Sequence, residues 1–123
     1  MLVVDDDDIV LATVRRTLEN TGYRVLAVST AQEALEIARA GPGPITVAIL
    51  DYGLPEMPGT ELGEALSNLL SGIRVLISSG MPAGSIQLSP GQRFLDKPFT
   101  ARTLLAAVLE EVLGAAAHGE SAD

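Results

Sequence analysis

Charged side chains that can bind a cation or a phosphoryl group occur at three places in the sequence, each where a short apolar run ends. These are the acidic run Asp5 to Asp8, then Asp51, and then Lys97. If the apolar runs are neighbouring parallel strands, their carboxyl ends meet at one edge of a sheet, where open α/β sheets bind ligands. Carboxylates that meet there repel one another, so they must take up a proton or bind a cation. Because hard oxygen ligands favour Mg²⁺ or Mn²⁺, and Mg²⁺ shares its shell with phosphate oxygens, the sequence predicts a cation site that handles phosphoryl groups.

Each of these groups also has an ordinary structural explanation when it is taken alone. An acidic run can cap a helix, an aspartate after a strand often starts a turn, and a lone lysine is usually a surface residue. Taken together, they make Asp51 a candidate nucleophile or metal ligand, and Lys97 a point charge for a phosphoryl oxygen. Ser78 and Ser79 end another apolar run, and one of their hydroxyls either donates to a phosphoryl oxygen or only closes a strand.

The elements that must position these residues follow an alternating pattern along the chain. Apolar runs predict strands at 2–4, 24–28, 45–50, 74–78 and 93–95. Helical spacing of apolar residues predicts helices at 9–20, 31–40 and 60–70, and a last helix that begins after Thr100 and ends at Gly114. Such alternation implies a doubly wound α/β fold with helices on both faces of a five-stranded parallel sheet. The flavodoxin-like strand order 2-1-3-4-5 places the first and third strands side by side, and with them Asp5, Asp6 and Asp51.

The segment from residue 81 to residue 92 interrupts this pattern. It contains Pro82, Gly84, Pro90 and Gly91, and a helix of normal length cannot run through so many breakers. We expect at most one turn, near residues 85–88, so that the fourth helix of the fold is short or missing. The segment is predicted to be mostly irregular and mobile.

The composition fits one domain. The chain has 123 residues, which we divide into a domain at 1–114 and a flexible tail at 115–123 that contains the solvated His118. A net charge of −8 argues against nucleic-acid binding, and the absence of cysteine excludes disulfide and thiolate chemistry. We find neither an apolar run long enough to span a membrane nor a signal peptide, and we therefore expect a cytoplasmic domain.

Four motifs, in this order, resemble the receiver domain of two-component response regulators, from Leu2 to about Leu113. They are the acidic run, the segment from Asp51 to Gly59, the segment from Val75 to Gly80, and the segment from Phe94 to Phe99. The Pro/Gly-rich loop after Gly80 is more similar to receivers of hybrid sensor kinases or to single-domain regulators.

The resemblance implies a role for each matching residue. Asp51 is expected to be the phospho-acceptor, with Asp6 a direct Mg²⁺ ligand, Asp5 a ligand through water, and the backbone carbonyl of Gly53 a further ligand. Four more residues complete the implied site: the phosphate-binding Lys97, the switch hydroxyl of Ser79, the switch aromatic Phe94, and Pro98, whose preceding peptide bond is often cis.

The implied function is that of a signalling switch rather than a conventional enzyme. A histidine kinase or a histidine phosphotransfer protein would donate the phosphoryl group of a phosphohistidine to Asp51. The domain would catalyse its own phosphorylation and, because Gly53 and Met81 offer no acid or amide to orient a water, only slow dephosphorylation. The downstream partner and dimerisation are left open.

Two alternatives remain at the level of sequence. A Mg²⁺-dependent phosphatase with an aspartate nucleophile, of the haloacid-dehalogenase type, would carry a second acid two residues after the nucleophile, where this chain has Gly53. A pseudo-receiver that acts only as an interaction module usually lacks the acceptor or the lysine, and both Asp51 and Lys97 are present.

Overall fold

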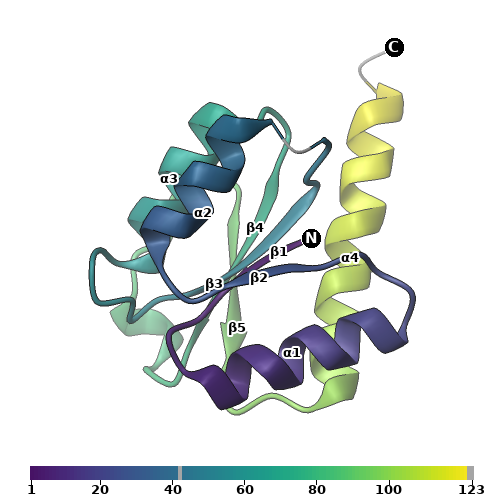
Figure 1. Cartoon of the computed structure of the whole chain (residues 1–123). Coiled ribbons are helices and arrows are strands. Elements are labelled where there is room, and N and C mark those ends of the chain that lie inside the picture. The colour runs from purple at the N-terminus through teal and green to yellow at the C-terminus, as the bar shows by residue number, and fades with distance from the viewer. Residues whose placement is uncertain (42, 122–123) are drawn as a thin grey trace.

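Five parallel strands form one sheet, and helices cover both of its faces (Figure 1). The computed structural model describes residues 1–41 and 43–121, with only the backbone for 115–121. The strand order is β2-β1-β3-β4-β5, so the flavodoxin-like fold predicted from the sequence is confirmed. The strands are β1 (Leu2–Val4), β2 (Leu26–Val28), β3 (Val47–Asp51), β4 (Arg74–Ser79) and β5 (Gln92–Asp96). The helices are α1 (Asp8–Asn20), α2 (Ala31–Ala40), α3 (Gly59–Leu69) and α4 (Ala101–Ser121), with a short 3₁₀ helix η1 (Ala83–Ser85).

The core consists of two apolar clusters, one on each face of the sheet. One cluster packs the sheet against α2 and α3, and the other packs it against α1 and α4. Successive residues of a strand point to opposite faces, and so the three central strands β1, β3 and β4 supply both clusters. This is why β1 and β3 read as continuously apolar runs rather than as alternating ones.

Three helices begin at side-chain caps. Asp7 caps α1, and its Oδ1 accepts hydrogen bonds from two backbone amides of the first turn. Thr30 caps α2 by accepting from the amide of Glu33 at 3.1 Å, while the Glu33 carboxylate accepts from the Thr30 hydroxyl. Thr100 accepts from the amide of Thr103 at 3.1 Å and caps α4. The first two caps hold the turns that follow β1 and β2.

The segment between β4 and β5 has no regular helix of more than one turn, as its breakers predicted. Its only helical residues are those of η1, which lies slightly before the expected position because Pro82 starts the turn. Ser85 donates its hydroxyl to the carbonyl of Pro82 at 2.7 Å, and Ile86 is buried behind it. The predicted mobility of this segment stays a prediction.

The last helix does not end at Gly114, and this part of the prediction was wrong. α4 continues to Ser121, because one glycine costs only about 1 kcal/mol in a helix and the three alanines that follow it are strong helix formers. The missing side chain also makes room for Arg74, since a Cβ on Gly114 would lie 3.0 Å from its Nη2. The side chain of His118 lies outside the described residues, and the division at residue 114 stays a prediction. Among the described residues, no helix is long and apolar enough to cross a membrane.

Candidate active site

The strands bring Asp5, Asp51 and Lys97 to one edge of the sheet on the same face. Each of them comes two positions after a residue buried in the cluster that packs against α1 and α4. The three buried residues are Val3, Ile49 and Leu95. Because side chains alternate along a strand, the charged residues continue the same face beyond the core, at the carboxyl ends of β1, β3 and β5.

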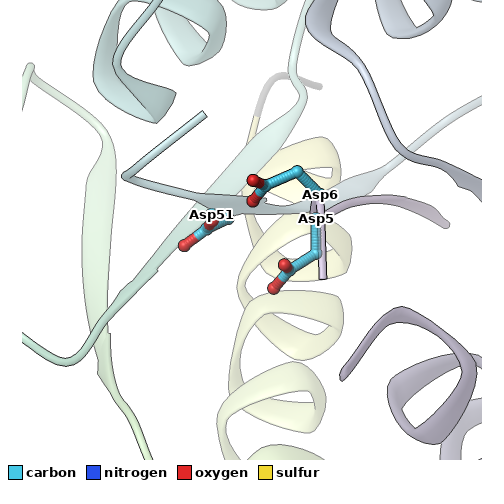
Figure 2. Close-up of side chains that lie close together, drawn as sticks. All are labelled: Asp5, Asp6 and Asp51. Atoms are coloured by element: carbon cyan, nitrogen blue, oxygen red, sulfur yellow. The ribbon is translucent and has the colours of Figure 1, made fainter. Parts of the chain in front are cut away.

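Three carboxylates converge at this edge (Figure 2). One oxygen from each of Asp5, Asp6 and Asp51 lies within 4.8 Å of the other two. Asp5 and Asp51 are buried, at 4% and 9% exposure, whereas Asp6 is exposed. Oxygens this close, from two strand ends, form the kind of donor set that a hard divalent cation binds.

Lys97 lies against the two buried carboxylates. Its Nζ is 3.0 Å from Oδ2 of Asp5 and 3.0 Å from Oδ1 of Asp51. Burial raises the pKa of Asp51, Lys97 acts in the opposite direction, and the charge of Asp5 raises it further. Burial alone would lower the pKa of Lys97, but its hydrogen bonds to Asp5 and Asp51 outweigh burial and raise it. This ammonium group contacts two of the three carboxylates, and the excess negative charge of the cluster favours a further cation.

The backbone after Asp51 turns sharply, and Gly59 makes this turn possible. The amide of Tyr52 donates to the carbonyl of Ser78, and the amide of Gly59 donates back to the carbonyl of Tyr52, both at 2.9 Å. A Cβ on Gly59 would come closer than 3.0 Å to the carbonyl group of Asp51. The sequence indicated a loop here but did not predict this close approach. Its only signal in the sequence was Gly59, the first residue of α3.

Ser79 and Phe94 lie near the charged group but on the other face of the sheet. Ser79 is buried, its Oγ accepts a hydrogen bond from the amide of Met81 at 3.0 Å, and its carbonyl accepts from the amide of Lys97 at 2.8 Å. Phe94 is half-buried and pairs in register with Ile77, which belongs to the cluster under α2 and α3. Ser79 follows Ile77 by two positions, and so Ser79 and Phe94 are diagonal neighbours on that face.

The remaining predicted residues lie on the two loops that border the carboxylates. Gly53 is exposed in the loop that follows Asp51. The peptide bond between Lys97 and Pro98 is cis. Pro98 also lines an open, mostly apolar groove of about 510 Å³ beside Lys97, which sequence reasoning missed. Its other lining residues are Ile9, Val10, Thr13, Val14, Gly80 and Phe99.

Comparison with known proteins gives one consistent family. Residues 1–109 match the family model of the response regulator receiver domain. The crystal structure of a CheY-like response regulator receiver domain protein from Methanospirillum hungatei JF-1 superposes with a TM-score of 0.85 at 30% identity, covering 95% of each chain. A response regulator protein from Burkholderia pseudomallei, solved with a phosphorylated aspartic acid, a calcium ion and citrate, gives 0.71 at 28% identity, covering 86% of this chain and 64% of that one.

One relative is a much longer protein than this chain. The sensor kinase CckA of Brucella abortus is 31% identical over 114 residues, which are 89% of this chain and 12% of the kinase. The chain thus spans about an eighth of the length of this relative.

Proposed function

The chain belongs to the response regulator receiver domain family, and from this premise we propose that it is a phosphorelay switch in which Asp51 accepts a phosphoryl group from a phosphohistidine. One observation carries the proposal: Asp51 lies with Asp5 and Asp6 within 4.8 Å and with Lys97 at 3.0 Å. An aspartate set between an acidic pair and a lysine has both a cation site and a positive charge for a phosphoryl group beside it.

The donor set fits Mg²⁺ because it consists of hard oxygens with excess negative charge. Asp5, Asp6, Asp51 and the backbone carbonyl of Gly53 would hold the ion, with Asp5 acting through water. When bound, it would offset negative charge on the oxygens of the phosphoryl group. Mn²⁺ has the same preference for oxygen and would substitute.

The transfer needs little covalent chemistry from the protein. An oxygen of Asp51 forms a bond to phosphorus while the bond between phosphorus and the histidine nitrogen breaks, and that nitrogen keeps the electron pair and takes up a proton. Lys97 leaves the Asp51 carboxylate to donate to a phosphoryl oxygen, since the phosphoryl group carries more negative charge than the carboxylate. The product is an aspartyl phosphate.

The switch is expected to run through Ser79 and Phe94. In this structure the hydroxyl oxygen of Ser79 accepts a hydrogen bond from the Met81 amide at 3.0 Å. On phosphorylation, the hydroxyl would rotate and donate to the phosphoryl group. Because Ser79 and Phe94 are diagonal neighbours on adjacent strands, movement of Ser79 would free space that Phe94 enters. The half-buried ring would then change the surface near β5 that a downstream partner contacts.

The groove beside Lys97 supports a protein donor. It combines apolar side chains of α1 with Pro98 and Phe99, and Ile9 at its edge is 78% exposed. An open groove lined mostly by apolar side chains, next to the lysine that contacts Asp51, fits a docking surface. The donor would be a histidine kinase or a histidine phosphotransfer protein.

The decisive experiment incubates the chain with Mg²⁺ and acetyl phosphate, a small phosphodonor. We expect an adduct that is about 80 Da heavier, the mass that one phosphoryl group adds. The adduct should be stable in acid and labile in base. Asp51→Ala should abolish it. An adduct that persists in Asp51→Ala, or no adduct in the wild type, would refute the proposal.

A further inference from the structure

The loop between Asp51 and α3 is bonded to a distant helix through a residue with no assigned role. Oε1 of Glu56 accepts a hydrogen bond from the backbone amide of Ala31 at 2.7 Å, across 25 positions of sequence. Ala31 is the first residue of α2 and is fully buried. Its amide is one of the helix-terminal N–H groups that no carbonyl of the helix can satisfy. Glu56 therefore completes the cap that Thr30 begins, and its negative charge lies at the positive end of the helix dipole.

The same helix terminus is connected to the acidic pair. α2 follows β2 after a short turn, and the carbonyl of Val28, the last residue of β2, accepts the amide of Asp5 at 3.3 Å. The turn between β2 and α2 thus contacts both segments that supply the candidate cation ligands. On one side it holds the backbone of Asp5, and on the other it holds the loop that contains Gly53 and Glu56.

The loop has few other anchors around Gly53. Leu54 is buried in the core, but Gly53, Pro55 and Glu56 are exposed. No described atom lies within 4 Å of the position that a Cβ on Gly53 would take. Gly53 therefore lies between Tyr52, whose amide donates to the carbonyl of Ser78, and two later anchors. These anchors are the buried side chain of Leu54 and the bond from Glu56 to α2.

We propose that Glu56 is a positioning residue for the cation site: its bond to the Ala31 amide sets the distance of the Gly53 carbonyl from Asp5 and Asp6. The inference rests on the proposed function, because it assumes that this carbonyl binds the metal. Glu56 itself does not touch the ion. Its removal lowers the affinity for Mg²⁺ without removing a ligand.

The test measures Mg²⁺ affinity by isothermal titration calorimetry in wild type, Glu56→Ala, Glu56→Gln and Glu61→Ala. The glutamine removes the charge but keeps an oxygen that accepts from Ala31, whereas Glu61→Ala removes an equal charge from the first turn of α3. We expect Glu56→Ala to bind Mg²⁺ about three- to tenfold more weakly than Glu61→Ala, at the low end of what outer-shell partners of a metal contribute. Glu56→Gln should recover most of this loss, and the phosphorylation rate at saturating Mg²⁺ should be the same in all four proteins.

A second readout needs no metal. Hydrogen exchange at the Ala31 amide, followed by NMR, should be faster in Glu56→Ala than in Glu56→Gln. Equal Mg²⁺ affinities in Glu56→Ala and Glu61→Ala would overturn the inference, and so would a glutamine variant as weak as the alanine variant. A wild type that fails to bind Mg²⁺ would instead refute the metal site of the proposed function, and the inference with it.

Discussion

The ammonium group of Lys97 lies 3.0 Å from Oδ1 of Asp51, although the two residues are 46 positions apart in the chain. The same nitrogen lies 3.0 Å from Asp5. In the absence of a cation, Lys97 is therefore the main positive charge that opposes the repulsion between these carboxylates. Its removal should make stability depend strongly on the metal.

We predict that Lys97→Gln lowers the free energy of unfolding by about 1–3 kcal/mol without Mg²⁺, because it leaves two buried carboxylates without their charged partner. Saturating Mg²⁺ should recover more stability in the variant than in the wild type. Urea denaturation without Mg²⁺ and with saturating Mg²⁺ checks this. Arg102→Gln, an equal loss of charge at an exposed position of α4, is the control. Equal effects of the two substitutions would contradict the prediction.

Asp51→Asn is expected to stabilise the metal-free protein, whereas Lys97→Gln destabilises it. Burial and the charge of Asp5 raise the pKa of Asp51, so the folded state disfavours its charged form. An acid whose pKa is raised on folding destabilises the protein at pH values above that pKa, and a neutral amide removes this cost. We predict that Asp51→Asn raises the free energy of unfolding by about 1 kcal/mol at neutral pH without Mg²⁺. The gain should shrink when Mg²⁺ is added, since the variant lacks one carboxylate of the proposed cation site. A less stable variant in metal-free urea titrations would contradict this.

Gly59→Ala should disrupt the turn after Asp51. The added Cβ would collide with the carbonyl group of Asp51 and approach the Cα of Tyr52. Both are backbone groups that cannot move aside without shifting Asp51. We predict a loss of about 2–3 kcal/mol in the free energy of unfolding, as expected for overpacking at a close contact. Gly84→Ala is the matched control, because its Cβ would meet no described atom within 4 Å and its φ is not positive. Similar unfolding midpoints for the two variants would argue against the close approach.

Ile9→Ser should distinguish a protein donor from a small one. Ile9 lies at the edge of the groove beside Lys97 and is 78% exposed, so it has little to contribute to folding but much to an interface. We predict that the ratio of the phosphorylation rate from a phosphohistidine protein to that from acetyl phosphate falls about tenfold, as for removal of an apolar hot spot. Leu109→Ser, at a leucine of α4 that is 49% exposed and does not line the groove, should leave the ratio unchanged. Equal ratios for both variants would place the docking surface elsewhere.

The sequence predicted the fold and the members of the charged cluster because both follow from local patterns. Apolar runs that end in charged residues predicted the strand ends, and alternation with helices predicted the parallel order that brings Asp5 next to Asp51. The shared face of the sheet also follows from the sequence. Asp5, Asp51 and Lys97 each come two positions after a buried apolar residue, and side chains alternate along a strand. Ser79 follows Ile77 in the other cluster, which accounts for its place on the opposite face.

Features that depend on contacts between distant segments were not readable from local patterns. The bond between Glu56 and Ala31 joins residues whose own neighbourhoods predict only a loop and a helix start. Gly114 leaves space for Arg74, a contact from a distant strand that the local pattern around Gly114 does not indicate. The groove at Ile9 likewise forms only when α1 and the loop at Pro98 meet.

The lifetime of the aspartyl phosphate gives a last prediction, about Gly53 and Met81. Neither residue has a side-chain acid or amide that could orient a water toward the phosphorus, so we expect slow self-dephosphorylation. Gly53 is exposed, its φ is not positive, and a Cβ there would meet nothing within 4 Å, so an asparagine fits without strain. Gly53→Asn should shorten the lifetime about tenfold, since a positioned group that assists proton transfer or water attack typically contributes 10²–10⁴-fold, and an amide can orient a water but cannot take its proton. The decay of the adduct is followed by mass spectrometry after the phosphodonor is removed.

The control is Gly53→Ala, which adds a Cβ at the same position without an amide. Its adduct should decay like that of the wild type. If the asparagine and alanine variants decay equally slowly, water attack is not limited by the residue at position 53.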